Sequence, residues 1–375
     1  MAARHSEAFA VGGQRVRRGE TADIALQVSQ TSLGMPVTVP VRVIRGARRG
    51  PAVFVSGAIH GDELNGTGII RELMLKGLEL KRGTLILVPV VNVFGFERHS
   101  RYLPDRRDLN RSFPGSPDGS LAFRLAHAFY EQIVRHCDYG IDLHTATQGR
   151  VNFPHVRGDL GDRGVNRLAR WFGCELVLDR RGHEHSVRQV ATEGGCSTIV
   201  LEAGESLKIE RRVVEVGVRG VFNVLQSLRM VDGQPSLPEA LLIVQKSQWA
   251  RAHVGGLLRF SVSPGDVVTE GMRIAHCDTF FGNQSPSVRA PVGGVVLGMC
   301  SLPVVRPGVP VCHIGIPDVP VEQLAERLRR ERPQRTGPTR LARMEAYPAR
   351  LRRLDDPPAP PAPTADGSQT SRGSK

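Results

Sequence analysis

The chain has 375 residues, of which 40% are hydrophobic, so it is long enough for a large core and a second domain. Its 50 lysines and arginines outnumber its 37 acidic residues, but aromatic residues reach only 5% and form no basic-aromatic platform for nucleic acid. No stretch has the length of a membrane-spanning helix, the N-terminus carries no secretory signal, and the six cysteines include no CxxC pair. We therefore expect a cytoplasmic protein with no nucleic-acid or membrane partner.

The first two thirds of the chain are predicted to begin with strands and then to alternate strands with helices. Residues 8–46 are β-rich in pattern, with alternation of apolar residues over 37–43. Buried strands are then predicted at 52–56, 84–91, 139–143, 176–178 and 198–201. Helices are predicted at 62–76, 120–136, 163–172 and 213–229. This order predicts an α/β fold with a mixed, mostly parallel sheet flanked by helices.

The last third of the chain has a different pattern. Residues 239–316 show short apolar runs punctuated by glycine and proline, which predicts a small all-β, barrel-like module. Later residues are rich first in arginine and leucine and then in proline, alanine and serine, and we expect 357–375 to be disordered. The expected division is an N-terminal β-rich segment (1–36), an α/β domain (37–232), a small β-domain (233–318) and a basic, proline-rich, largely disordered tail (319–375).

Three predicted strands lead to side chains that can bind a metal or transfer a proton. One apolar run leads to His60, with Glu63 just behind it, a second leads to His144, and a third leads to Glu202. In open α/β sheets the ligand crevice lies at the carboxyl ends of the strands, so these side chains can meet in one cleft. Two imidazoles and two carboxylates are plausible parts of a catalytic site with one zinc ion per subunit.

Five segments resemble the motifs of one enzyme family and follow that family's order. They are VSGAIHGDELNG, VPVVNVFGF, SRYLPDRRDLNRSFPG, IDLHTAT and LEAGE. Together they resemble the zinc carboxypeptidase-like amidohydrolases of the succinylglutamate desuccinylase/aspartoacylase family, over roughly residues 37–316. The resemblance implies a zinc-hydrolase catalytic domain over 37–232 with a zinc carboxypeptidase-like fold.

The resemblance implies a role for each residue of the strand-end group. His60, Glu63 and His144 become the zinc ligands. Glu202 becomes the general base that activates the zinc-bound water and later protonates the leaving amine. Two neutral imidazoles and one carboxylate would leave zinc an open position and lower the pKa of its bound water to around 7.

The resemblance also implies an arginine at the reacting carbonyl. Arg101 matches the family arginine that polarises the carbonyl and stabilises the oxyanion. Two extra residues separate it here from the Asp-Leu-Asn-Arg motif, compared with animal aspartoacylases. Arg106 or Arg107 could therefore take the role instead.

Four further residues receive roles from the same resemblance. Asn110 and Arg111 match the pair that holds a substrate carboxylate, and Arg188 matches a second substrate-binding arginine. Asp108 matches the carboxylate that orients a ligand histidine. We therefore expect a small anionic N-acylated substrate.

The small β-domain resembles the barrel attached to many family members, with a biotinyl/lipoyl-like pattern over 289–294. A carrier domain needs a lysine at its hairpin tip, but no lysine occurs between Lys246 and Lys375. We therefore reject a swinging-arm function. The domain is expected to cover the cleft, restrict substrate size or form a contact in a homo-oligomer.

The sequence thus predicts a zinc-dependent hydrolase that cleaves the amide bond of a small N-acyl amino acid or related N-acylated compound. One alternative is a zinc carboxypeptidase acting on peptide or cell-wall fragments, since the same zinc chemistry would serve it. Another is a catalytically weak binding protein that uses the tail or barrel for interactions. The acyl group and the amine stay open, and Asn152, His155 and Arg157 are pocket candidates without an assigned role.

Overall fold

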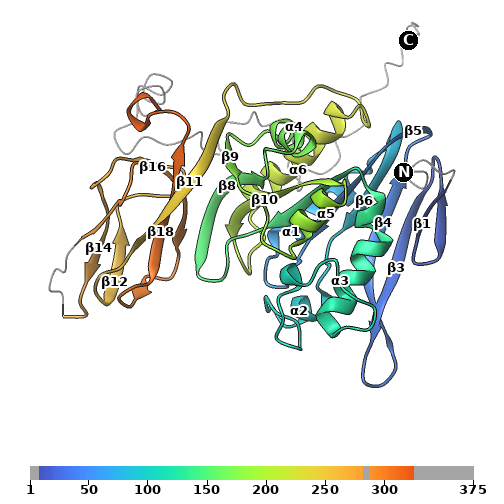
Figure 1. Cartoon of the computed structure of the whole chain (residues 1–375), viewed down its shortest axis with the longest axis horizontal. Coiled ribbons are helices and arrows are strands. Elements are labelled where there is room, and N and C mark those ends of the chain that lie inside the picture. Colours follow the sequence, from blue (N-terminus) through green and yellow to red (C-terminus); the bar gives the residue numbers. More distant parts are fainter. Residues whose placement is uncertain (1–7, 282–286, 325–375) are drawn as a thin grey trace, which may run out of the picture. The chain divides into compact units, whose positions relative to one another are not determined.

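The computed structural model of the chain describes residues 8–281 and 287–324, drawn in colour in Figure 1. These residues form a 12-stranded sheet, a 4-stranded sheet and a 2-stranded hairpin. In spatial order, the strands of the large sheet are β13 (Val267–Val268), β16 (Gly294–Cys300), β18 (Pro310–Pro317), β11 (Leu242–Arg251), β9 (Leu176–Asp179), β8 (Arg150–Gly158), β10 (Ser197–Glu205), β7 (Tyr139–His144), β5 (Arg48–Gly57), β6 (Arg82–Val88), β4 (Pro36–Arg45) and β3 (Thr21–Gln30). The hairpin and the small sheet contain β1 (Ala8–Val11), β2 (Gln14–Arg17), β12 (Gly256–Phe260), β14 (Arg273–Asp278), β15 (Val288–Arg289) and β17 (Val304–Val305).

Helices connect most of the parallel strands. The helices and 3-10 turns of the described residues are α1 (Asn65–Leu75), α2 (Val93–Glu97), η2 (Leu109–Arg111), α3 (Leu121–Gln132), η3 (Val134–His136), α4 (Arg163–Phe172), α5 (Val187–Glu193) and α6 (Arg211–Ser227). Each helix expected from the sequence is present, although the long one predicted at 120–136 is divided into α3 and η3.

The large sheet contains two blocks of parallel strands that run in opposite directions. β10, β7, β5 and β6 are parallel neighbours, and so are β8, β9 and β11. The blocks meet where β8 pairs antiparallel with β10, and the pairings toward both ends of the sheet are also antiparallel. The α/β class is thus confirmed, but the sheet as a whole is mixed and not mostly parallel. Strands joined by short turns, such as β3 and β4, can pair only antiparallel.

The strand β8 and the helix α5 were not predicted from the sequence. β8 carries Pro154 near its centre, and proline cannot donate to a strand ladder, so this stretch does not look like a central strand. Most of its residues are only half-buried, which weakens the apolar signal. α5 has 7 residues, too few to show a helical period.

The strands after residue 240 partly continue the large sheet. β11, β13, β16 and β18 belong to it, and β16 also pairs with β8, whereas β12, β14, β15 and β17 form the small sheet. Both sets share a hydrophobic core that includes Cys277, Val296 and Ile314. The predicted small β-domain is therefore all-β, but several of its strands extend the sheet of the preceding domain.

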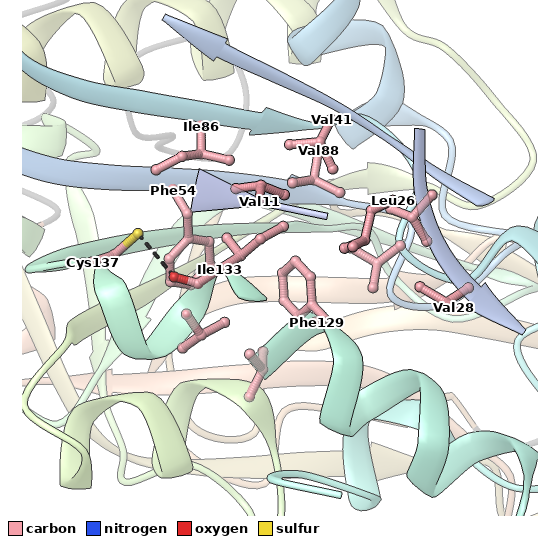
Figure 2. Close-up of a cluster of buried hydrophobic side chains, with 14 of the residues drawn as sticks. Val11, Leu26, Val28, Val41, Phe54, Ile86, Val88, Phe129, Ile133 and Cys137 are labelled. Atoms are coloured by element: carbon pink, nitrogen blue, oxygen red, sulfur yellow. Dashed lines mark hydrogen bonds between the residues drawn. The ribbon is translucent and has the colours of Figure 1, made fainter. Parts of the chain in front are cut away.

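One hydrophobic core packs α3 and α5 against the large sheet, and Figure 2 shows part of it. Phe54 of β5 contacts Phe129 of α3 edge to face, with ring centroids 6.0 Å apart. Val11 of β1 and Leu26 of β3 belong to the same cluster, so the N-terminal strands help to build this core. Val55 is fully buried but lies outside this cluster, because neighbouring strand side chains point to opposite faces.

The opposite face is covered by α1, α6 and α4, with α6 in contact with both of the others. A Cβ atom at Gly217 of α6 would lie 2.3 Å from Ile69 of α1, and one at Gly220 would lie 2.3 Å from Phe172 of α4. These glycines therefore let α6 approach both neighbours closely. Helices on both faces bury the parallel strands, as their continuous apolar runs require.

Most of the predicted tail lies outside the described residues, which end at residue 324. No helix in the described part of the chain is long and apolar enough to cross a membrane.

Gly61 gives a test of the turn that follows β5. A Cβ atom there would be 2.0 Å from the carbonyl carbon of Gly95 in α2, so the backbone would have to move. We predict that Gly61→Ala lowers the free energy of unfolding by about 1–3 kcal/mol, the usual cost of overpacking. Gly255→Ala is the control, because its nearest neighbour would lie 3.5 Å away. Equal stabilities of the two variants in a urea titration would contradict the close contact.

Candidate metal centre

His60, Glu63 and His144 are the group of described residues whose side chains could jointly hold a metal ion. Their ligand atoms lie within 4.8 Å of one another, and the residues are 3%, 2% and 6% exposed. His60 follows the end of β5, Glu63 precedes α1, and His144 is the last residue of β7. The structure thus brings together the three residues that the sequence analysis expected to be ligands.

The parallel pairing of β5 with β7 brings His60 and Glu63 close to His144. Gly57 pairs with Leu143, so the two strands end side by side at the same edge of the sheet. A tight turn follows β5, in which the Glu63 N–H donates to the His60 carbonyl at 3.1 Å. The rings of His60 and His144 consequently lie with their centroids 4.9 Å apart.

Each histidine contacts a second carboxylate on the side away from Glu63. Nε2 of His60 lies 3.2 Å from Asp108, and Nε2 of His144 lies 2.6 Å from Asp142. Both Nδ1 atoms face Glu63, at 2.7 and 2.8 Å. Because a carboxylate accepts a hydrogen bond, an imidazolium can donate from both of its nitrogens here. With a cation between the rings, each Nδ1 would give its lone pair to the ion, while each Nε2 would still donate to its aspartate. Two imidazole nitrogens and a carboxylate are a donor set that suits zinc.

Asp142 is a residue to which the sequence analysis gave no role. It is 0% exposed, and its second oxygen accepts a hydrogen bond from Ser56 at 2.8 Å. Asp142 and His144 lie two residues apart in one strand, so their side chains share a face. This spacing is the signal that could have identified it.

The carboxylates govern the protonation of the two imidazoles. Burial disfavours imidazolium, but Glu63 and Asp108 outweigh it and raise the pKa of His60. For His144, burial is likewise outweighed by Asp142 and Glu63, which raise its pKa well above the ordinary value. Burial alone would raise the pKa of Glu63, but the two histidines lower it. The cluster therefore stabilises positive charge at its centre, which a divalent cation would also supply.

Arg101 lies directly beside this cluster. Its Nη2 donates to Asp108 at 2.8 Å. Its Nη1 lies 3.2 Å from Nδ1 of His60 and 3.4 Å from Glu63. A permanently charged guanidinium is therefore held next to the candidate ligands, where it could stabilise a developing oxyanion.

The two rival arginines point elsewhere. Arg106 is exposed, and the Arg107 guanidinium lies 5.7 Å from the centroid of the Phe123 ring. Arg101 lines the pocket described below, whereas Arg106 and Arg107 do not. Among the three arginines that the sequence left open, the geometry favours Arg101.

Glu202 lies on β10, the strand next to β7. Its Cα pairs with that of His144 in the parallel register. Its Oε2 accepts a hydrogen bond from Asn152 at 2.9 Å, and its Oε1 lies 3.4 Å from Nη1 of Arg157. The side chain is 14% exposed and lines the same pocket as the cluster. An acid–base group thus stands beside the candidate metal centre, an arrangement that general-base hydrolysis requires.

The three expected substrate-binding residues have different surroundings. Oδ1 of Asn110 accepts from the backbone N–H of Val187, at the start of α5, at 2.9 Å. Arg111 is exposed and donates to the Asn110 carbonyl at 2.7 Å. Arg188 has a buried Nη1 with no hydrogen-bond partner among the described residues. Burial, followed by the charge of Arg157, lowers the pKa of Arg188 to about 10. Such an unsatisfied buried donor is suited to an anionic ligand.

These side chains face a pocket of about 280 Å³ with a strongly basic lining. Its arginines are Arg101, Arg111, Arg150, Arg157 and Arg188, and its carboxylates are Glu63 and Glu202. Both carboxylates already have cationic partners. The pocket would therefore attract a small anionic compound.

Trp249 of β11 and His313 of β18 also line the pocket. Their rings are stacked, with centroids 4.5 Å apart and an interplanar angle of 6°. The Arg150 guanidinium lies 4.8 Å from the centroid of the Trp249 ring. Burial, followed by the charge of Arg157, lowers the pKa of His313 to about 4, so the stacked imidazole is neutral at neutral pH. This pair was not predicted from the sequence, because neither residue belongs to a motif.

The contact between Asp142 and His144 can be tested by metal binding. We predict that Asp142→Asn lowers zinc affinity about 10–100-fold, because a carboxamide holds the imidazole less firmly than a carboxylate does. Competition with a chromophoric chelator measures the affinity. Ser56→Ala is the control, since it removes the second hydrogen bond of Asp142 but keeps its charge. An unchanged affinity in Asp142→Asn would show that this carboxylate does not support the ligand.

Known proteins resemble this chain in sequence and in fold. The family model of the succinylglutamate desuccinylase/aspartoacylase catalytic domain matches residues 49–228. The N-alpha-acetyl-L-2,4-diaminobutyric acid deacetylase of Halomonas elongata is 31% identical over 264 residues, which cover 64% of this chain and 73% of the relative. The product-bound ectoine utilization protein EutE (DoeB) of Ruegeria pomeroyi has a TM-score of 0.72 at 23% identity, covering 80% of this chain and 96% of that chain. A succinylglutamate desuccinylase/aspartoacylase of Rhodobacter sphaeroides has a TM-score of 0.71 at 22% identity, with the same coverage of 80% and 96%. The chain belongs to the succinylglutamate desuccinylase/aspartoacylase family.

Proposed function

We propose that this chain is a zinc-dependent hydrolase that cleaves the amide bond of a small N-acyl amino acid or a related N-acylated compound. The observation that carries the proposal is the Glu202 carboxylate, which lines the same pocket as the His60, Glu63 and His144 cluster. The deacetylase activity in the name of the Halomonas elongata relative supports the same reaction class.

In this proposal His60, Glu63 and His144 hold one zinc ion. Asp108 and Asp142 orient the two imidazoles so that Nδ1 of each ring faces the centre. A zinc ion bound by two imidazoles and one carboxylate supplies a Lewis acid that lowers the pKa of water and polarises a carbonyl group.

Glu202 transfers the proton that the reaction requires. It accepts a proton from the attacking water while the water oxygen forms a bond to the carbonyl carbon. It then donates this proton to the nitrogen as the carbon–nitrogen bond breaks, so the products are a carboxylate and an amine. Arg101 remains charged throughout and stabilises the negative charge on the former carbonyl oxygen.

Arg188, with Asn110 and Arg111, is proposed to hold an anionic group of the substrate. The support is the buried Nη1 of Arg188, which has no hydrogen-bond partner within the described residues. An arginine binds a carboxylate through paired, charge-assisted hydrogen bonds. A substrate carboxylate would therefore satisfy a buried donor that the described residues leave without a hydrogen-bond partner.

The pocket favours a small substrate over a peptide or a cell-wall fragment. Its volume of about 280 Å³ lies just below the roughly 300–1,000 Å³ typical of pockets for drug-sized ligands. Trp249 and His313 add an aromatic wall to it. A role in binding alone is disfavoured, because the complete ligand group and the base would then have no use. The cytoplasmic location and a homo-oligomer stay predictions from the sequence.

Glu202→Gln tests the base directly. We expect kcat to fall about 10²–10⁴-fold, because a carboxamide keeps the shape but cannot accept the proton. The zinc content, measured by elemental analysis, should stay the same. Glu205→Gln is the matched control on the same strand, because Glu205 does not line the pocket. Full activity of the Glu202→Gln variant would rule out its role as the base.

The substrate class can be tested with a panel offered to the zinc-loaded protein. We expect hydrolysis of N-acetyl or N-succinyl amino acids and little cleavage of dipeptides, because the pocket is small and lined by arginines. Treatment with a chelator should abolish the activity, and added zinc should restore it. Cleavage of the dipeptides alone would favour the carboxypeptidase alternative.

A further inference from the structure

Strand β8 returns alongside the proposed base and contacts it. We propose that Asn152, His155 and Arg157 of β8 are positioning residues that hold the Glu202 carboxylate in the orientation needed for proton transfer. This inference rests on the proposed function, in which Glu202 is the general base. It gives a role to three residues that the sequence singled out without assigning one.

Both oxygens of Glu202 have a partner on β8. Asn152 Nδ2 donates to Oε2 at 2.9 Å, and Nη1 of Arg157 lies 3.4 Å from Oε1. A glutamate side chain is flexible, and contacts at both oxygens restrict its rotation. Each carboxylate oxygen has two acceptor sites, so a site remains on each for a water molecule. The carboxylate is thus held but still able to accept a proton.

A β-bulge brings the three residues of β8 to one face. His155 pairs with Glu202 and Asn152 pairs with Gly204, so β8 has one more residue than β10 between these two pairs. In a regular strand, residues three apart would point to opposite faces. The extra residue in the bulge shifts the alternation of side chains by one position, so Asn152 and His155 point to the same face of the sheet. Pro154 lies within the bulge, where its missing N–H disrupts no regular ladder.

His155 fixes the orientation of Arg157. Nδ1 of His155 lies 2.7 Å from the Phe153 carbonyl, which can only accept, so Nδ1 carries the proton. Nε2 then accepts from Nε of Arg157 at 3.1 Å. The ring is 0% exposed, and burial followed by the charge of Arg157 lowers its pKa well below the ordinary value. A neutral imidazole with one fixed tautomer therefore holds the guanidinium toward Glu202.

Two neighbouring arginines of the pocket differ in their partners. Arg157 already contacts His155 and Glu202, whereas Nη1 of Arg188 is buried without a partner. The first arginine is thus suited to position the base and the second to bind the substrate. Their variants can separate the two roles in one enzyme.

The first experiment compares Arg157→Met with Arg188→Met in the zinc-loaded, full-length protein. We expect Arg157→Met to lower kcat about 10²-fold with little change in KM, because a misplaced base slows the chemical step. Arg188→Met should mainly raise KM. Zinc content and circular dichroism verify that both variants are folded. A raised KM with unchanged kcat in Arg157→Met would overturn the proposal, since Arg157 would then bind substrate.

The second experiment introduces Arg157→Met into the Glu202→Gln variant. If Arg157 acts through Glu202, it should change the residual activity by less than about threefold, whereas independent losses would multiply. Multiplied losses would overturn the proposal. Full activity of Glu202→Gln alone would instead rule out Glu202 as the general base, and a lack of amide hydrolysis by the unaltered, zinc-loaded protein would refute the proposed function. The two failures are therefore distinguishable.

The third experiment tests His155 with two variants of different chemistry. His155→Gln can present an oxygen acceptor to Arg157, whereas His155→Leu fills similar space without one. We expect the glutamine variant to retain clearly more of kcat than the leucine variant, with equal zinc content. Equal kcat values in the two variants would show that His155 does not position Arg157.

Discussion

A single buried carboxylate, that of Glu63, is the group on which the site depends. It is 2% exposed, and a charge in the protein interior is costly unless it is paired and hydrogen-bonded. Its oxygens lie 2.7 Å from Nδ1 of His60 and 2.8 Å from Nδ1 of His144, and one of them accepts a hydrogen bond from the N–H of Thr145 at 3.0 Å. His60 follows β5 and His144 ends β7. The contacts of both histidines with Glu63 therefore link the ends of these two strands. A divalent cation would satisfy the same carboxylate between the same imidazoles.

The large sheet contains two parallel blocks that run in opposite directions, and this arrangement places Glu202 between the candidate ligands on one side and β8 on the other. β10 runs parallel to β7, so Glu202 and His144 reach the same edge. After β7 the chain turns at Gly149, whose φ of 76° suits glycine, and β8 runs back beside β10. A strand parallel to β10 would begin at the opposite edge of the sheet, and only its last residues would reach the pocket. Because β8 instead runs antiparallel to β10, its residues Asn152 and Arg157 both reach the Glu202 carboxylate.

The sequence predicted the features that follow local rules. Apolar runs that end in His60 and His144 indicate strand ends at a crevice, and the long amphipathic helices show their period. Contacts across the sheet were not predictable, because Pro154 argues against a strand at this place and does not show which strand β8 pairs with or in which register. The choice between Arg101 and its rivals likewise needed coordinates, since loop residues have no periodicity to orient them. Trp249 lines the pocket beside His313, its partner in the pairing of β11 with β18, and this long-range pairing is not visible in a single sequence.

The stacked pair of Trp249 and His313 lies beyond residues 49–228, the part of the chain that matches the family's catalytic domain. Part of the pocket wall therefore comes from a later stretch of the chain than the candidate ligands and Glu202. Substitutions at Trp249 or His313 would therefore reshape the cavity while the proposed ligands and the proposed base stay intact. A polypeptide truncated after α6 would lose this aromatic boundary together with β11 and β16, the sheet neighbours of β9 and β8.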